Sequence, residues 1–117
     1  KRLRNENGFF TLLNKYSNEK IQPIFQHYVF GNYTVERAII DGLKINKNNE
    51  IRIRNAMFNL FNQIKNWKLL MDLAKKNNLV NEVKELYFQA RNNVKVKKIP
   101  KRYLQWLIIM IKFNYLS

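Results

Sequence analysis

Apolar residues recur along the chain at the three- and four-residue spacing of an α-helix, and they rarely alternate as they do in a β-strand. The clearest stripe falls on one side of a helical wheel and consists of Ile53, Met57, Leu60, Phe61 and Ile64. It predicts an amphipathic helix that begins after a capping residue, Asn48 or Asn49. The whole pattern predicts an all-α fold, either a compact bundle or a short helical-repeat array, with six to seven helices.

The same spacing places further helices on both sides of this stripe. The expected helices are residues 8–16, a short helix after Pro23 that ends at Gly31, a helix from Asn32 or Thr34 to near Gly42, and residues 67–76, 80–91 and 101–113. Residues 44–49 are expected to form a polar loop. Asn77 and Asn78 separate two helices, and asparagine tolerates the left-handed backbone of a tight turn. Residues 67–91 should therefore form an antiparallel helical hairpin.

Two segments near the C-terminus differ from this regular pattern. Residues 92–98 are expected to form an extended connector, with a strand as the alternative, because residues 94–97, Val-Lys-Val-Lys, alternate between apolar and polar. Pro100 then precedes a helix that is apolar nearly all round, because only Gln105 and Lys112 are polar between residues 104 and 113. Such a helix must lie in the core or be covered by a partner.

Length and composition favour one soluble or peripheral domain. The chain has 117 residues, and its 46% hydrophobic residues, with eight Phe, six Tyr and two Trp, are enough for a core and exclude global disorder. Residues 1–117 are thus expected to form a single basic α-helical domain. The longest apolar run, residues 106–111, is far shorter than the roughly 20 residues of a membrane-spanning helix.

Residues that could carry out catalysis are scarce. The chain has one His, two Asp, six Glu and no Cys. His27 has no second His or Cys with which to share a metal ion, so we expect an ordinary surface or partly buried imidazole. With three glycines, no glycine-rich phosphate-binding loop is present. We therefore expect no enzyme activity, no metal, no cofactor and no small-molecule substrate.

Positive charge is the strongest functional signal. The chain has 22 Lys and Arg against 8 Asp and Glu, a formal net charge of +14. Residues 91–102 contain no acid and six cations, namely Arg91, Lys95, Lys97, Lys98, Lys101 and Arg102. Lys1, Arg2 and Arg4 would extend this surface if the two termini meet. Such a charge density repels itself, which favours a polyanion as partner.

Structured RNA is the polyanion we expect. Arginine, lysine and exposed aromatic residues suit RNA, and no recognition helix with helix-turn-helix spacing favours duplex DNA. Phe58 and Phe88 lie off the apolar stripes of their helices, either as platforms for bases or as extra packing contacts. The expected function is a non-catalytic RNA-binding subunit of a larger ribonucleoprotein, such as a ribosome-type particle. The expected location is intracellular, cytoplasmic or organellar, with neighbouring proteins of the particle as further partners.

Three alternatives stay open. In the first, the domain is a helical protein-interaction module that docks through its apolar C-terminal helix and uses its charge to recognise an acidic protein. In the second, the charge only keeps the protein soluble. The third and weakest is attachment to an anionic membrane surface, because Tyr103 and Trp106 follow the basic run as they do in interfacial segments.

Residues 64–91 resemble one tetratricopeptide repeat unit. The large and small apolar residues of such a hairpin fall on Trp67, Leu70, Ala74, Val80, Val83, Tyr87 and Ala90. Met71 stands where that family prefers a small residue. One period earlier, Tyr33 takes the position of the Trp, but Glu36 takes an apolar position. The resemblance implies a helical scaffold that binds other macromolecules and catalyses nothing.

Residues 30–36, Phe-Gly-Asn-Tyr-Thr-Val-Glu, are similar to the core of a Pumilio-type RNA-binding repeat. The resemblance implies that Asn32 and Glu36 touch a base edge and that Tyr33 stacks on the base. Glu36 replaces the usual Gln, and no second copy is visible. The alternative is that Gly31 stops one helix and Asn32 caps the next.

Overall fold

The computed structural model describes residues 4–5, 8–17, 20–22, 29–30, 33–96 and 100–101. The α-helices in this part are α1 (Gly8–Tyr16), α2 (Val35–Ile45), α3 (Ile51–Leu60), α4 (Trp67–Lys76) and α5 (Val80–Asn93). A 3₁₀ helix, η1 (Phe61–Gln63), continues α3, and the two-residue strands β1 (Arg4–Asn5) and β2 (Val29–Phe30) pair antiparallel. The all-α prediction is confirmed, with five α-helices in the described ranges against six to seven expected. The predicted last helix lies outside these ranges, except for Lys101.

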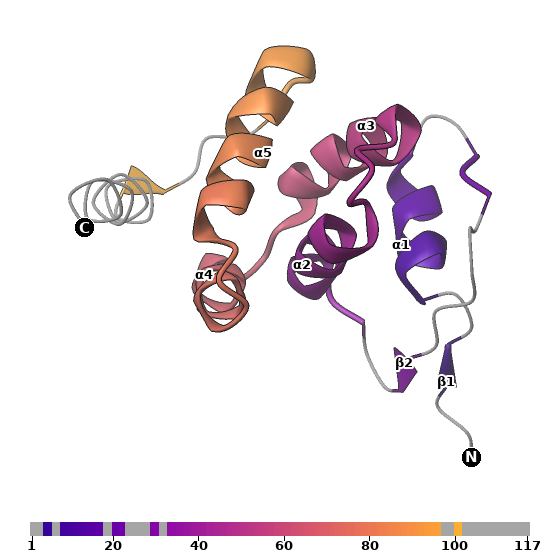
Figure 1. Ribbon diagram of the computed structural model, residues 1–117, viewed down its shortest axis with the longest axis horizontal. Coiled ribbons are helices and arrows are strands. Elements are labelled where there is room, and N and C mark those ends of the chain that lie inside the picture. The colour runs from indigo at the N-terminus through magenta and orange to yellow at the C-terminus, as the bar shows by residue number, and fades with distance from the viewer. Residues whose placement is uncertain are drawn as a thin grey trace.

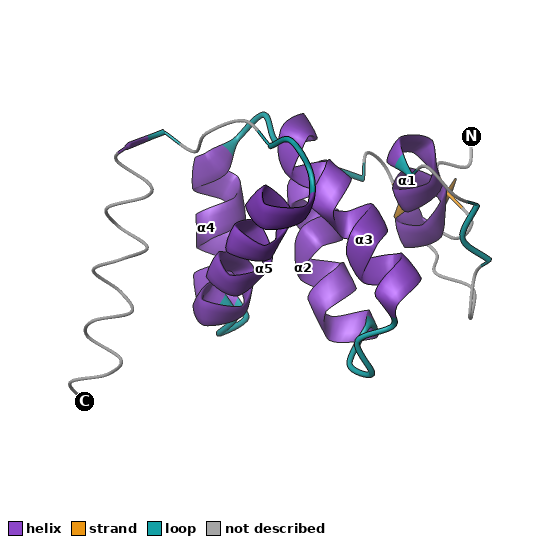
Figure 2. Cartoon of the chain, turned by 90° about the horizontal axis from the view of Figure 1, so that it is seen from above, coloured by secondary structure: helices purple, strands orange, loops and turns teal. Residues whose placement is uncertain are grey.

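The helices form a row around one core (Figures 1 and 2). α1 lies at one end of the row and α4 at the other, with α2 and α3 between them. α5 packs against α2, α3 and α4, while β1 and β2 lie at the α1 end. No helix within the described ranges is long and apolar enough to cross a membrane.

Local signals in the sequence set several helix ends. α1 and α4 begin and end at the predicted residues. The Thr34 hydroxyl accepts a hydrogen bond from the Arg37 backbone N–H at 3.2 Å and caps α2, and the Asn66 side chain accepts one from the Leu69 N–H at 3.0 Å and caps α4. Asn78 has a φ of 60°, the left-handed backbone expected between α4 and α5.

The predicted stop at Gly42 is wrong, because α2 continues through this residue to Ile45. Gly42 is buried where α2 approaches α3. A Cβ atom at this position would lie 2.5 Å from Cε of Met57 and 3.0 Å from Cε1 of Phe9. The missing side chain therefore allows two helices to pack closely, and it does not end the first one.

The start of α3 also differs from the prediction, which placed the cap at Asn48 or Asn49. Glu50 is the capping residue, and its carboxylate accepts a hydrogen bond from the Arg52 N–H at 2.8 Å. Asn49 has a φ of 56° and forms the turn before the cap. The amide of Asn46 closes this turn through hydrogen bonds with the backbone N–H and carbonyl of Glu50.

The last residues of the helix that was predicted to end at Gly31 form a strand and not a helix. Val29 and Phe30 form β2, in which Phe30 pairs with Arg4 and Val29 pairs with Asn5. Valine and phenylalanine fit a pleated strand, and β1 supplies hydrogen-bond partners that a short isolated helix lacks. Residues 23–28, which make up most of that predicted helix, lie outside the described ranges.

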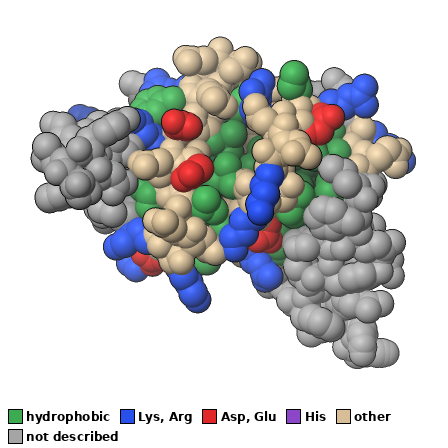
Figure 3. All heavy atoms as spheres, viewed as in Figure 1, with side chains coloured by type: hydrophobic (Ala, Val, Ile, Leu, Met, Phe, Trp, Pro, Cys, Tyr) green, Lys and Arg blue, Asp and Glu red, His purple; other side chains and the backbone are tan. Residues whose placement is uncertain are grey.

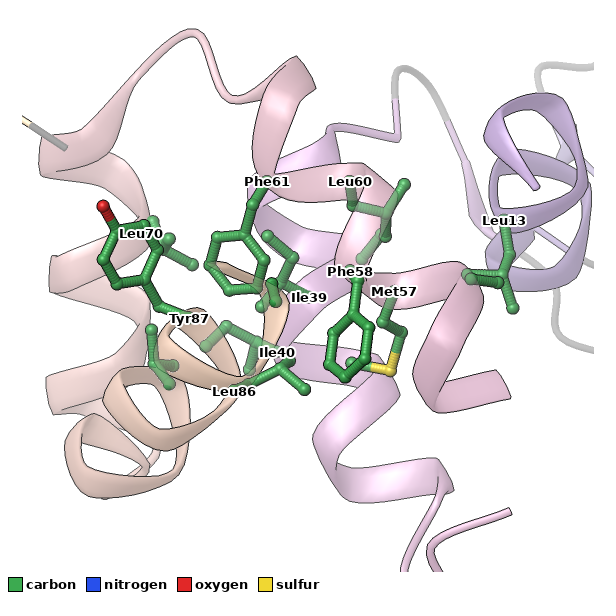
Figure 4. Close-up of a cluster of buried hydrophobic side chains, with 14 of the residues drawn as sticks. Leu13, Ile39, Ile40, Met57, Phe58, Leu60, Phe61, Leu70, Leu86 and Tyr87 are labelled. Atoms are coloured by element: carbon green, nitrogen blue, oxygen red, sulfur yellow. The ribbon is translucent and has the colours of Figure 1, made fainter. Parts of the chain in front are cut away.

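Side chains from all five helices form one apolar core (Figure 4). An aromatic group of Phe61, Trp67 and Tyr87 joins η1, α4 and α5, with the ring centroids of Phe61 and Tyr87 5.7 Å apart and those of Trp67 and Tyr87 6.0 Å apart. Phe58 is only 1% exposed, so it packs in the core and is no platform for a base. It is buried despite lying off the main stripe because α3 contacts α1, α2 and α5 on several sides.

Candidate nucleic-acid interface

The last turn of α5 begins the basic surface that the sequence predicts. Arg91 is exposed there, and its guanidinium carbon lies 5.9 Å from the centroid of the Tyr87 ring. Tyr87 is fully buried and therefore fixed by its neighbours. A cation–π contact to a fixed ring orients the guanidinium while leaving its outer edge accessible.

Residues 94–96 follow α5 as an extended segment, as predicted, and form no strand, whereas residues 92 and 93, also expected in the connector, belong to α5. Val94 and Val96 are partly buried against the core, and Lys95 between them is exposed. The Asn62 side chain donates a hydrogen bond to the Lys95 carbonyl oxygen at 2.6 Å, which ties the segment to η1. The alternation in the sequence thus reflects one side facing the core and one side facing solvent.

The other predicted cations are described only in part. Lys101 is exposed. Lys97, Lys98, Arg102, Lys1 and Arg2 lie outside the described ranges. Arg4 belongs to β1, at the α1 end of the row, far from α5 (Figures 1 and 2). Among the predicted cations in the described ranges, Arg91 and Lys95 lie at and just after the end of α5, whereas the backbone of Arg4 lies at the α1 end of the row.

Carboxylates are absent from most described elements around this end of α5. α1, η1, α3 and the second half of α5 contain no Asp or Glu, and Glu50 just before α3 is engaged in its cap. The other described acids lie elsewhere, and two of them are paired: Asp72 with Lys68 at 2.9 Å on α4, and Asp41 with Tyr33 beside α2. Figure 3 shows Lys and Arg side chains spread over one face of the molecule, with Asp and Glu side chains at several separate places among them.

A hollow of about 270 Å³ opens between the end of α1, α3 and the end of α5. It is lined by Ser17, Arg52, Asn55, Ala56, Phe58, Asn59, Asn93 and Val94. Among the described residues, the lining contains three amides and one guanidinium, and no carboxylate. A second hollow, of about 460 Å³, is lined by Asn62, Gln63, Lys95 and Val96. Val94 lines the first hollow and Lys95 and Val96 line the second, so the two hollows are neighbours along the extended segment that follows α5.

Sequence reasoning missed this hollow because its lining comes from three separate parts of the chain. One signal was available: residues 51–71 contain four cations, including Arg52, and no acid. The asparagines carried no comparable signal, because asparagine is common throughout the sequence. Only the packing of α3 against α1 and α5 brings Asn55, Asn59 and Asn93 together.

The base contacts implied by the Pumilio-type resemblance are not possible for Glu36. This residue is 4% exposed, and its carboxylate accepts hydrogen bonds from the backbone N–H groups of Lys65 and Asn66, each at 2.8 Å. It therefore joins α2 to the start of α4 and has no access to a base. Asn32 lies outside the described ranges.

Tyr33 is likewise engaged within the fold and does not present a free ring to a base. Its hydroxyl donates a hydrogen bond to Asp41, and the Arg37 guanidinium lies over its ring at 5.3 Å from the centroid. Burial, followed by the hydrogen bond to Asp41 and the charge of Asp41, raises the pKa of the Tyr33 hydroxyl, and Arg37 partly opposes this rise. The Tyr33 hydroxyl is thus held in its neutral form.

The described residues contain no group of three or more His, Cys, Asp or Glu side chains that could hold a metal ion. No protein-family model, no curated protein and no solved structure matches the chain. The described residues themselves therefore define the class: a basic, helical protein in which most described elements around the end of α5 contain no Asp or Glu.

Proposed function

We propose that this protein is a non-catalytic RNA-binding subunit of a larger ribonucleoprotein. The observation that carries the proposal is the exposure of Arg91 and Lys95 at an end of the domain where α1, α3, η1 and the second half of α5 contain no acid. A surface without carboxylates does not neutralise its own cations. The phosphates of RNA supply the missing negative charge.

The contacts proposed here are with phosphates and not with bases. Each neutralised phosphate releases condensed counterions, so the logarithm of the binding constant falls with that of the salt concentration by about 0.7 to 0.9 per contact. Lys97, Lys98, Lys101 and Arg102 follow directly in the sequence and belong to the proposed surface, with Lys1, Arg2 and Arg4 as secondary candidates. Such contacts hold RNA in place without reading its sequence.

The absence of catalysis is part of the same proposal. Among the described acids, Glu36, Glu50, Asp41 and Asp72 are engaged in hydrogen bonds within the fold, and Glu82 and Glu85 are exposed on α5. The alternative of a protein partner on the apolar C-terminal helix depends on residues outside the described ranges. The exposed cations among the described residues support an anionic partner, for which we propose RNA.

The test is binding of the full chain to a structured RNA, to duplex DNA and to polyglutamate at several salt concentrations, measured by fluorescence anisotropy. The charge-reversed variants are Arg91→Glu and Lys95→Glu. The matched control is Lys76→Glu, which reverses an exposed cation on α4 and changes the net charge by the same amount. We expect structured RNA to bind most tightly, and each interface variant to weaken binding and flatten its salt dependence more than the control.

Two results would contradict the proposal. The first is equal and weak binding of all three polyanions, which would make the charge nonspecific. The second is an equal loss of affinity in Lys76→Glu and in the two interface variants, because only the total charge would then matter.

A further inference from the structure

The hollow between α1, α3 and α5 has a lining suited to hydrogen bonding with a small planar molecule. Ala56 and Phe58, both nearly fully buried, and the partly buried Val94 lie along its apolar side, and its polar part contains Asn55, Asn59 and Asn93. Its volume of about 270 Å³ is just below the roughly 300–1,000 Å³ of pockets for drug-sized ligands. It can therefore hold one small ring system and not several stacked ones.

The hydrogen bonds within the fold define what two of these amides can offer a ligand. Asn59 donates from Nδ2 to the Tyr16 carbonyl at 3.0 Å, and Asn93 donates from Nδ2 to the Gln89 carbonyl at 2.7 Å. These bonds fix both side chains and leave the Oδ1 atom of each as an acceptor. The hollow thus offers two oriented carbonyl acceptors.

Asn55 supplies a hydrogen-bond donor to complement these two acceptors. It is exposed on α3, and its side-chain amide makes no hydrogen bond with the described part of the chain. It can donate and accept at the same time. Arg52, one turn earlier on the same helix, adds positive charge to the lining.

We propose that this hollow binds one unpaired nucleobase that carries an exocyclic amino group, with adenine preferred. An asparagine amide can donate to N7 of adenine while accepting from its N6 amino group, and the carbonyls of Asn59 and Asn93 are further acceptors for an amino group. Uracil has no exocyclic amino group. No carboxylate of the described residues lines either hollow, and the exposed Lys95 beside them offers positive charge to the phosphates of the same strand.

This inference rests on the proposed RNA-binding function and adds base recognition to it. Proteins recognise RNA sequence mostly in loops and bulges, where unstacked bases expose their edges. A base in this hollow would belong to such an unpaired position of a structured RNA. The phosphate contacts at Arg91 and Lys95 would then give affinity, and the hollow would give selectivity.

The experiment compares labelled oligoadenylate and oligouridylate of equal length, each titrated with the full chain and read by fluorescence anisotropy. We expect oligoadenylate to bind about fivefold more tightly or better, which is the lower end of the discrimination by one bidentate amide–base pair. Asn55→Leu should remove most of this preference without changing the salt slope. Lys95→Glu should weaken both oligonucleotides equally and keep their ratio.

The matched control is Asn92→Leu, which changes an exposed asparagine of α5 that does not line the hollow. A second readout uses nuclear magnetic resonance, with adenosine 5′-monophosphate and uridine 5′-monophosphate as probes. The side-chain amide signals of Asn55 and Asn93 should shift with the adenosine nucleotide, and the signal of Asn92 should not.

The outcomes separate the two proposals. Equal affinity for both oligonucleotides would overturn the base pocket and leave phosphate binding intact. An adenine preference that survives Asn55→Leu, with no amide shift at Asn55 or Asn93, would also overturn it, because the selectivity would come from another site. No binding to any RNA would overturn both proposals.

Discussion

The carboxylate of Glu36 on α2 accepts a hydrogen bond from the backbone N–H of Asn66, at 2.8 Å, directly before α4 begins. It accepts a second from the N–H of Lys65 at the same distance. Asn66 in turn caps α4 by accepting from the Leu69 N–H. A buried carboxylate at a helix N-terminus satisfies N–H groups and favours the helix dipole, so Glu36 fixes where α4 starts relative to α2.

Replacing Glu36 by leucine should therefore destabilise the fold. The change leaves two backbone N–H groups without an acceptor, and each such group costs about 1–3 kcal/mol. We expect Glu36→Leu to lower the free energy of unfolding by about 2 kcal/mol or more, and Glu36→Gln to lower it less, because the amide carbonyl still accepts. Urea denaturation followed by circular dichroism measures both. Glu85→Leu, at an exposed position beyond the first turn of α5, is the control and should stay within about 0.5 kcal/mol.

The raised pKa of Tyr33 predicts how stability changes at alkaline pH. In the unfolded chain the hydroxyl ionises near its ordinary value of about 10, whereas in the folded protein burial and Asp41 keep it neutral to higher pH. The stability contributed by neutral Tyr33 is thus fully present below about pH 10 and is lost as the pH rises further. Urea denaturation at about pH 8 and about pH 11 should show a smaller loss for Tyr33→Phe than for the wild type. Equal losses would contradict this assignment.

The close approach of Gly42 and Met57 predicts a coupled pair of substitutions. Gly42→Ala favours the helix by about 1 kcal/mol, but its Cβ atom would lie 2.5 Å from Cε of Met57, and overpacking costs about 1–3 kcal/mol. We expect a net loss of stability in the wild-type background and a gain when Met57 is already alanine. A double-mutant cycle measured by chemical denaturation gives the coupling free energy. A value near zero would show that the two residues do not interfere.

The hydrogen bond from Asn62 to the Lys95 carbonyl predicts that residues 94–96 can be loosened without unfolding the domain. Asn62→Ala should weaken RNA binding by less than tenfold, because one such hydrogen bond contributes about 1 kcal/mol. Amide hydrogen exchange at residues 94–96 should become faster. Gln63→Ala, in the same 3₁₀ helix, is the matched control. Slower RNA dissociation in Asn62→Ala would contradict the positioning role of this bond.

The sequence alone predicted the elements whose signals are local. The ends of α1 and α4 and the turn at Asn78 depend on residues within one or two turns of the chain, and the structure has them where they were expected; the cap of α2 is Thr34, one of the two residues predicted. The extended segment after α5 was also predicted, because two valines alternate with exposed lysine. A cluster of cations that are close in the sequence can likewise be identified from the sequence alone, because it does not depend on residues from elsewhere in the chain.

Tertiary structure alone decided what depends on a neighbour from elsewhere in the chain. Gly42 continues a helix because Met57 lies against it, and Phe58 is buried because helices contact α3 on several sides. Glu36 occupies an otherwise apolar position because the backbone N–H groups before α4 need an acceptor there. The amide-lined hollow exists only where α1, α3 and α5 meet. Hydrophobic periodicity predicts which face of a helix is buried. It does not predict which side chain of another helix packs against that face, because that side chain comes from a distant part of the sequence.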